Sequence, residues 1–281
     1  TAGAGNDTID GGKGDDIAIF SGNKSDYTIT ETGYGQYTVV DNRTASTWSA
    51  ADVATNVDGA MDSYVADLNG DGYLDIVTAS MHDNTIAWYE NNKDRNPTFT
   101  KEDISTSAAS ANGIFVADLD GDGDLDIVSA TASGNTIAWY ENNGAADPSW
   151  SKADIATSVI SARDIYVADM DGDGDLDLFV ANHGSRQSEE TRPPNPGADN
   201  RLYENHGGVF VDVSERLSVE DRQGYSFLGG WFDVNSDGSP DLQIINDFGL
   251  EIYANRLLLN DGTGHFESVS SSDLSLAGDA M

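Results

Sequence analysis

The sequence DLDGDGDLD at residues 118–126 organises the chain, because it occurs in four versions. The others are DLNGDGYLD at 67–75, DMDGDGDLD at 169–177 and DVNSDGSPD at 233–241. We number these nine-residue acidic loops 1 to 4 in chain order. Each loop has side-chain oxygens at its first, third, fifth and ninth positions.

This spacing is typical of a loop that binds a hard cation. Ca²⁺ is coordinated by about six to eight oxygens at roughly 2.3–2.6 Å. Alternate residues of a tight loop face one point, so the first, third and fifth side chains can share an ion, and the seventh residue can add its backbone carbonyl. The closing acid stands at position nine rather than at position twelve as in an EF-hand, and no helical pattern flanks it. We therefore predict a Ca²⁺ loop between strands.

The alternative is that Asp and Gly simply form turns here. Metal binding is favoured because the pattern occurs four times and an apolar run follows each copy, such as Ile127-Val128 after loop 2. A cluster of four carboxylates is also unfavourable unless a cation neutralises it.

The loops recur at a regular interval. Asp67 and Asp118 are 51 residues apart, and so are Asp118 and Asp169. The interval from Asp169 to Asp233 is 64 residues, so the third unit contains an insertion. A fixed period of this length predicts a repeat architecture.

Each unit predicts four short strands. Around loop 2 they are expected at 114–117, 125–130, 136–140 and 151–155. Four strands in about 50 residues, without helical periodicity, predict the blades of a β-propeller. The predicted fold is therefore all-β: a propeller over residues 46–281, with about four blades, after a separate N-terminal segment over residues 1–45.

DLDGDGDLDIV at 118–128, followed by NTIAWYENN at 135–143, resembles the FG-GAP/VCBS repeat family, which includes integrin-α-like calcium-binding β-propellers. The resemblance covers roughly residues 46–266. It implies a ring that commonly has seven blades, which we expect to be completed by further residues or by another chain; a four- or five-bladed ring is the alternative. Residues 264–281 are interpreted as the opening of a fifth unit.

Carried over loop by loop, the resemblance implies about four Ca²⁺ sites. Their side-chain ligands would be Asp67, Asn69, Asp71 and Asp75; Asp118, Asp120, Asp122 and Asp126; Asp169, Asp171, Asp173 and Asp177; and Asp233, Asn235, Asp237 and Asp241. The backbone carbonyls would come from Tyr73, Asp124, Asp175 and Ser239. Loop 4 departs from the pattern at Ser236 and Pro240, so we expect it to be the weakest or most distorted site.

Residues 2–19 contain two nonapeptides, AGAGNDTID and GGKGDDIAI, that resemble the calcium-binding repeats of the RTX family. The resemblance implies turns of a parallel β-roll in which Asp7 and Asp16 hold further Ca²⁺ ions. The alternative is a flexible Gly/Asp leader. Because the sequence starts inside a repeat, we expect a mature product or a fragment of a longer chain. Alternating residues at 27–30 and 37–40 then predict a hairpin.

The composition limits the partners. The 281 residues include 14 basic and 49 acidic residues, for a formal net charge of −35, and no cysteine. Such a charge repels nucleic acid and anionic membranes, and no apolar run is long enough to span a bilayer. Free Ca²⁺ in the cytosol is too low to fill sites of moderate affinity. We therefore expect a secreted or cell-surface protein.

Two further regions offer candidate sites. The insertion at 182–199 carries His183, Arg186 and Arg192, which could bind an acidic sugar or a partner carboxylate, although we favour a tolerated surface loop. Trp88 and Trp139 could form a sugar-binding platform. We favour a core role, because neighbouring residues on a strand face opposite sides and the recurrence itself indicates packing.

Three functions follow from these observations. We favour a calcium-binding propeller that serves adhesion or extracellular assembly, with a protein or glycan partner at the cell surface. A lectin-like carbohydrate-binding module is the second hypothesis. An enzyme acting on polysaccharides is the third and is not favoured, because the sequence singles out no catalytic pair.

Overall fold

The computed structural model describes residues 27–33, 36–41, 52–94, 97–183, 199–246 and 254–269. The chain divides into two compact units, residues 1–52 and 53–281. In the first unit, β1 (Tyr27–Gly33) and β2 (Gln36–Asp41) pair antiparallel, which confirms the predicted hairpin. Asp7, Asp16 and the β-roll predicted around them lie outside the described residues, so the β-roll stays a prediction.

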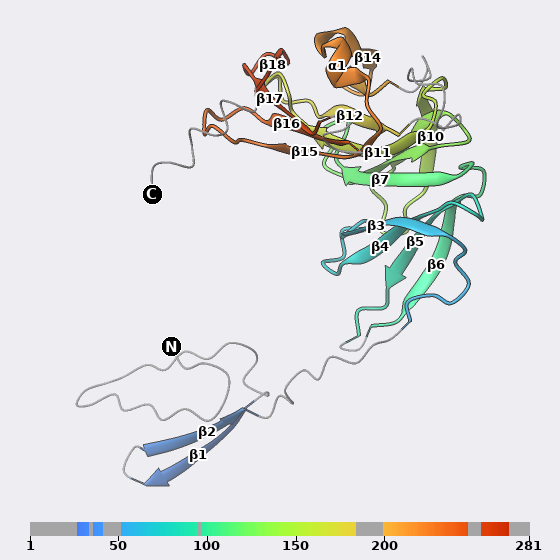
Figure 1. The fold of residues 1–281 in the computed structure, drawn as a ribbon. Coiled ribbons are helices and arrows are strands. Elements are labelled where there is room, and N and C mark those ends of the chain that lie inside the picture. Colours follow the sequence, from blue (N-terminus) through green and yellow to red (C-terminus); the bar gives the residue numbers. More distant parts are fainter. Residues whose placement is uncertain are drawn as a thin grey trace. The chain divides into compact units, whose positions relative to one another are not determined.

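The second unit contains four antiparallel sheets of four strands each, which we call blades 1 to 4 (Figure 1). Blade 1 comprises β3 (Ala60–Ala66), β4 (Asp75–Ser80), β5 (Thr85–Asn91) and β6 (Phe99–Ser105); blade 2 comprises β7 (Ala111–Ala117), β8 (Asp126–Thr131), β9 (Thr136–Asn142) and β10 (Trp150–Ala156); blade 3 comprises β11 (Ala162–Ala168), β12 (Asp177–Asn182), β13 (Arg201–Asn205) and β14 (Phe210–Asp212); and blade 4 comprises β15 (Ser226–Phe232), β16 (Asp241–Asn246), β17 (Arg256–Asn260) and β18 (Phe266–Ser268). This nearly all-β array of β-propeller-like blades confirms the predicted fold class.

Every blade is built in the same order. The first strand leads into an acidic loop, and the loop leads into the second strand, as from β7 to β8 in blade 2. All residues of β8 and β12 are buried, so their continuous apolar runs face protein on both sides, as in a stack of sheets. Within the described residues, no sheet closes on itself.

The hydrophobic core lies between the blades. Three clusters of buried side chains fill the interfaces between blades 1 and 2, 2 and 3, and 3 and 4. Successive residues of one strand supply different clusters: Ile127 packs toward blade 1, whereas Val128 packs toward blade 3. Each such aliphatic side chain contributes about 1.5–3 kcal/mol when fully buried. Neighbouring blades therefore stabilise one another.

The recurring aromatic residues belong to these interfaces. Trp139 packs in the cluster shared with blade 3, and the adjacent Tyr140 packs in the cluster shared with blade 1. Trp88 is also buried, against blade 2. These indoles are core residues, as the favoured interpretation predicted, and they offer no exposed platform for a sugar.

The C-terminal part of the array differs from the sequence-based expectation. Phe266 pairs with Asn260 as part of β18, the fourth strand of blade 4, so residues 266–268 complete a blade instead of opening a fifth one. The expectation rested on Gly264-His265-Phe266, which in fact form the turn and start of a closing hairpin strand. The described helices are two single turns between blades 3 and 4, η2 (Ser214–Arg216) and α1 (Val219–Arg222). No described helix has the length and hydrophobicity needed to cross a membrane.

Candidate metal centres

The backbone of each acidic loop is held by its own first aspartate. In loop 2 the N–H groups of Gly121 and Gly123 donate to the two carboxylate oxygens of Asp118, at 2.8 and 3.1 Å. Loop 3 repeats this arrangement around Asp169. Hydrogen bonds of this kind hold a tight turn and keep the side chains of one loop close together.

The closing aspartate of each loop is buried. Asp126 is 1% exposed, and its two oxygens accept hydrogen bonds from the backbone N–H groups of Leu119 (3.2 Å) and Asn142 (2.8 Å). The same pair of bonds occurs at Asp75, Asp177 and Asp241 in the other loops. The closing residue therefore joins the start of the loop to the end of the third strand of its blade.

An asparagine at the end of the third strand joins neighbouring loops. The Nδ2 of Asn142 donates to the Leu125 carbonyl of its own loop at 3.1 Å and to the Leu68 carbonyl of the preceding loop at 2.9 Å. Asn205 bridges the Leu176 and Leu119 carbonyls in the same way, and Asn260 bridges those of Pro240 and Met170. We call Asn142, Asn205 and Asn260 the bridging asparagines. They couple each acidic loop to the one before it.

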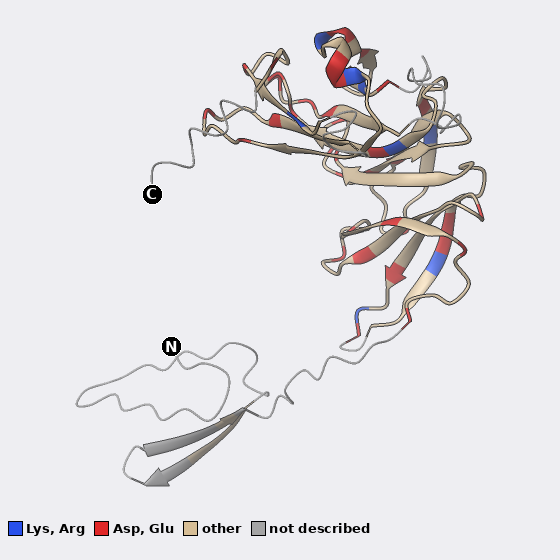
Figure 2. Ribbon diagram, in the orientation of Figure 1, with Lys and Arg blue, Asp and Glu red and all other residues tan. Residues whose placement is uncertain are grey.

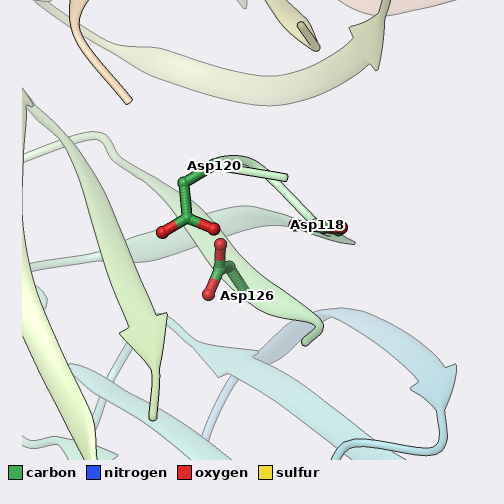
Figure 3. A group of neighbouring side chains, drawn as sticks. All are labelled: Asp118, Asp120 and Asp126. Carbon is green, nitrogen blue, oxygen red and sulfur yellow. The ribbon is translucent and has the colours of Figure 1, made fainter. Parts of the chain in front are cut away.

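Two loops bring three carboxylates together. In loop 2 one oxygen each of Asp118, Asp120 and Asp126 lies within 4.8 Å of the others (Figure 3). Asp169, Asp171 and Asp177 form the equivalent group in loop 3. Both groups contain three of the four predicted side-chain ligands.

The remaining predicted ligands of these loops lie outside the two groups. Asp122 at position five accepts a hydrogen bond from the N–H of Asp124 at 2.9 Å, and Asp173 does the same for Asp175. The position-five carboxylate, which the sequence predicted as a ligand, thus accepts a hydrogen bond from the backbone of the position-seven residue. The carbonyl of that position-seven residue was also a predicted ligand. Both residues still belong to the same short loops.

Burial makes the closing carboxylates of loops 2 and 3 costly to ionise. Removal from water raises the pKa of Asp126 to about 6 and that of Asp177 to about 7, although the backbone N–H groups of Asn142 and Asn205 act in the opposite direction. Neighbouring carboxylates, including Asp120 beside Asp126, raise the pKa further. A cation at these positions would relieve both effects.

Loops 1 and 4 carry asparagine at position three, and they form no such group within the described residues. In loop 1 the Nζ of Lys93 lies 2.9 Å from Asp71, and this hydrogen bond is the largest of the effects that hold the pKa of Asp71 below its usual value. The lysine supplies part of the positive charge that a metal ion would bring. Tyr73 at position seven donates its N–H to Asp71 at 2.8 Å.

Loop 4 keeps the backbone conformation despite its substitutions. Ser236 has a φ of 64°, close to the 77° of its counterpart Gly121. The Pro240 carbonyl still accepts from Asn260 at 3.0 Å, and Asp237 bonds to the N–H of Ser239 at 2.9 Å. The serine therefore adopts a left-handed conformation, which is energetically unfavourable for a residue with a side chain.

Sequence reasoning missed the contribution of the third strand. Glu204 lies beside Asp171 of loop 3, and it also bonds to Arg216 at 2.9 Å. Its contact with Asp171 is the largest of the effects that keep the pKa of Glu204 low. The pKa of Asp171 is raised, mainly by burial and then by the contact with Glu204. The Glu-Asn pair that follows tyrosine in three units was the available signal.

The donor set fits a hard cation. All side-chain atoms in the two groups of three carboxylates are oxygens, a set that suits Ca²⁺, Mg²⁺ or Mn²⁺ better than softer metals. The buried closing aspartate of each group accepts hydrogen bonds from two backbone N–H groups, and no lysine or arginine is among its hydrogen-bond partners in the described residues. The two groups can therefore hold a metal ion.

In the insertion at 182–199, the ring of His183 packs 4.3 Å from that of Phe227, measured between centroids. Arg186 and Arg192 lie outside the described residues. The insertion consequently supplies no described group of cationic side chains.

The fold and its loops define an array of β-propeller-like blades with acidic loops that can hold a cation. Two FG-GAP-like repeats match the chain, at residues 67–129 and 118–180. Each match begins at an acidic loop and ends in the second strand of the following blade. No curated protein matches the chain.

Proposed function

We propose that this chain is a secreted or cell-surface module whose blades are stabilised by Ca²⁺ and which serves adhesion or extracellular assembly. The observation that carries the proposal is the pair of three-carboxylate groups, Asp118/Asp120/Asp126 and Asp169/Asp171/Asp177. The FG-GAP-like repeats in the same residues support it.

Calcium is favoured over other hard cations for two reasons. Ca²⁺ accepts flexible, irregular sets of carboxylate and carbonyl oxygens, whereas Mg²⁺ demands a near-ideal octahedron and keeps much of its water. The loops offer carboxylates of different burial together with backbone carbonyls at position seven, which suits the less regular ion. Extracellular Ca²⁺ is also concentrated enough to fill sites of moderate affinity.

The charge of the chain supports a role outside the cell. Acidic residues occur throughout the blades and basic ones are few (Figure 2). Where Ca²⁺ is scarce, the carboxylates repel and the loops stay open; where it is abundant, metal binding contributes to folding. Asp7 and Asp16 in the predicted RTX-like repeats would add ions to the same transition. We assign the module a binding role rather than a catalytic one.

The proposal is tested by calcium titration calorimetry and thermal unfolding. We expect Ca²⁺ to raise the melting temperature and excess chelator to lower it. Asp120→Asn should weaken binding about tenfold at one site, because it removes a charge while the amide oxygen can still accept from Asp122. Asp147→Asn, an equal charge change on an exposed loop, is the control and should bind like the wild type. A melting temperature indifferent to chelator would refute the proposal.

Carbohydrate binding is a second candidate, favoured by a cavity of about 200 Å³ at the start of the first strands. Asn112 is buried there and its Oδ1 accepts no hydrogen bond, while the Arg163 guanidinium lies 4.8 Å from the centre of the Phe227 ring. A sugar hydroxyl could donate to the amide oxygen while the guanidinium donates to a neighbouring hydroxyl. On a glycan array, Arg163→Ala should then abolish binding and Arg201→Ala, outside the cavity, should retain it.

A further inference from the structure

The three interfaces between blades follow one rule. Along each first strand, alternate residues face the preceding and the following blade. In β7, Val116 packs toward blade 1 and Phe115 packs toward blade 3. The second residue of the acidic loop also faces the following blade, as shown by Leu119, which is 1% exposed. A bridging asparagine of that blade then bonds to its carbonyl, as Asn205 bonds to Leu119.

Blade 4 presents the same face, and no sheet in the described residues follows it. Its counterpart of Leu119 is Val234, which is 45% exposed, and Leu228 and Phe232 on the same side of β15 are exposed as well. No donor in the described residues reaches the Val234 carbonyl. A Cβ placed on Gly230 would meet nothing within 4 Å, whereas one on Gly229, which faces blade 3, would clash with Phe179. We call Leu228, Gly230, Phe232 and Val234 the trailing face.

Blade 1 presents the opposite face, and no described sheet packs against it from the preceding side. Val65 is 54% exposed, whereas its counterpart Val116 is 4% exposed. Leu74 is 59% exposed, whereas Leu125 at the same position of loop 2 packs into the cluster between blades 1 and 2. We call Met61, Val65 and Leu74 the leading face.

The hydrogen-bonding groups of the two faces are complementary. Asn91, the blade 1 counterpart of the bridging asparagines, donates its Nδ2 to the Leu74 carbonyl of its own loop at 3.0 Å. Its second amide hydrogen has no carbonyl of a preceding loop to bond to. The trailing face offers that carbonyl at Val234. Among the described residues, blade 1 thus has an unused donor beside the leading face, and the trailing face has an unused acceptor.

We propose that the trailing face of one copy of this chain binds the leading face of a second copy, head to tail. Phe232 and Val234 would pack against Val65 and Leu74, and Asn91 would donate to the Val234 carbonyl. The occupant is a second copy because the chain already forms this interface three times with its own blades. Head-to-tail contacts of this kind form rings where the rotation closes.

The proposed interface places acidic loop 4 beside acidic loop 1. Asp233, Asp237 and Asp241 would then approach Asp67 and Asp71 as neighbouring loops approach within the array. Their repulsion opposes association unless cations neutralise it. The inference specifies the partner in extracellular assembly and rests on the proposed function, because Ca²⁺ should favour the association.

The first test is the mass of the full chain in solution with Ca²⁺, measured by sedimentation equilibrium over a wide concentration range. We expect reversible association beyond the 29.8 kDa monomer. Val65→Asp on the leading face and Phe232→Asp on the trailing face should each weaken it at least about tenfold, because a carboxylate would be buried in an apolar contact. Both side chains are exposed in a single copy. Val209→Asp, an equal change on an exposed residue of blade 3, should associate like the wild type.

Mixing the two variants tests the head-to-tail geometry. Val65→Asp retains an intact trailing face and Phe232→Asp retains an intact leading face. An equimolar mixture should therefore form heterodimers at concentrations where each variant alone associates only weakly. A wild-type chain that stays monomeric, or a mixture that does not associate, would overturn the proposal. Calcium titration of the same samples separates the two ideas. If Ca²⁺ stabilises a permanently monomeric chain, only the docking inference fails.

Discussion

At the scale of single residues, Asn142 shows how the blades are held in register. Its amide hydrogens satisfy two carbonyls, that of the partly buried Leu125 in its own loop and that of the buried Leu68 in the preceding loop. Its backbone N–H bonds to the buried Asp126. The residue thus connects a carboxylate group, its own blade and the neighbouring blade.

Replacing this asparagine should be far more damaging than replacing its counterpart in blade 1. We expect Asn142→Ala to lower the free energy of unfolding by about 2–4 kcal/mol, because one buried and one partly buried carbonyl lose their donor. Asn91→Ala removes only one bond to a loop carbonyl, at a partly exposed site, and should cost about 1 kcal/mol. The bond that the Asn91 Oδ1 accepts from the Lys93 N–H has a counterpart at Asn142, which accepts from Gly144, so it does not distinguish the two variants. Urea denaturation of both variants measures the difference. Equal losses would show that the bond between blades contributes nothing.

Asp164 gives a prediction for pH. Burial raises its pKa to about 6, with a smaller rise from Asp62, while the Tyr166 hydroxyl and Arg163 act in the opposite direction. The folded state therefore keeps this proton to higher pH than the unfolded state. The destabilisation is absent below about pH 4, grows as the pH rises and is complete above about pH 6.

Asp164→Asn should accordingly be more stable than the wild type at neutral pH, by on the order of 2 kcal/mol. The amide keeps an oxygen for the Ile165 N–H, which donates to Asp164 at 2.9 Å. The advantage should disappear near pH 4. Urea melts of the two proteins between about pH 4 and pH 8 would reveal it, and a pH-independent difference would contradict the argument.

At the scale of elements, loops 2 and 4 place different residue types at the same left-handed backbone position. Gly121 and Ser236 share a left-handed φ, of 77° and 64°, and a Cβ on Gly121 would meet nothing within 4 Å. The two residue types should therefore differ in the cost of the left-handed conformation and not in packing. Loop 4 carries strain that loop 2 avoids.

Exchanging the two residue types should change stability in opposite directions. Ser236→Gly should stabilise the protein by about 0.5–1 kcal/mol, and Gly121→Ser should destabilise it by a similar amount. Thermal unfolding in chelator separates this backbone effect from any change in metal binding. If both variants shift in the same direction, the conformational explanation is wrong.

The strands themselves could be predicted because their signals are local. The period and the apolar run after each loop predict β8 and β12, and both are strands with every residue buried. The bond from Asn205 to the Leu119 carbonyl spans 86 positions of sequence, and no local pattern shows it. Likewise, Phe266 was misassigned because a short fourth strand resembles the start of a new unit until its pairing with Asn260 is known.

The site was predicted only in part for a related reason. Spacing places Asp118, Asp120 and Asp126 on one loop, and the structure brings them together. The spacing alone does not show that Asp122 would bond to the N–H of Asp124, or that Lys93 would approach Asp71. Those contacts depend on rotamers and on a turn after the third strand, which the loop sequence does not encode.

At the scale of the whole molecule, a net charge of −35 should make the fold sensitive to salt when Ca²⁺ is absent. In excess chelator, added NaCl should raise the melting temperature, because screening at about 0.1 M acts over roughly 10 Å. With saturating Ca²⁺ the same salt series should have a smaller effect, since bound ions already neutralise the loops. Equal slopes in the two series would show that the loops do not dominate the repulsion.

Because the apolar clusters lie between sheets rather than within them, no single sheet can be removed without exposing its neighbours. Such a stack behaves as a one-dimensional chain of nearest-neighbour contacts. Amide protons in the central sheets should therefore exchange with deuterium last, and those of β3 and β15 first. Binding of a partner to blade 1 or blade 4 should slow amide exchange first in that blade and then in the blade next to it.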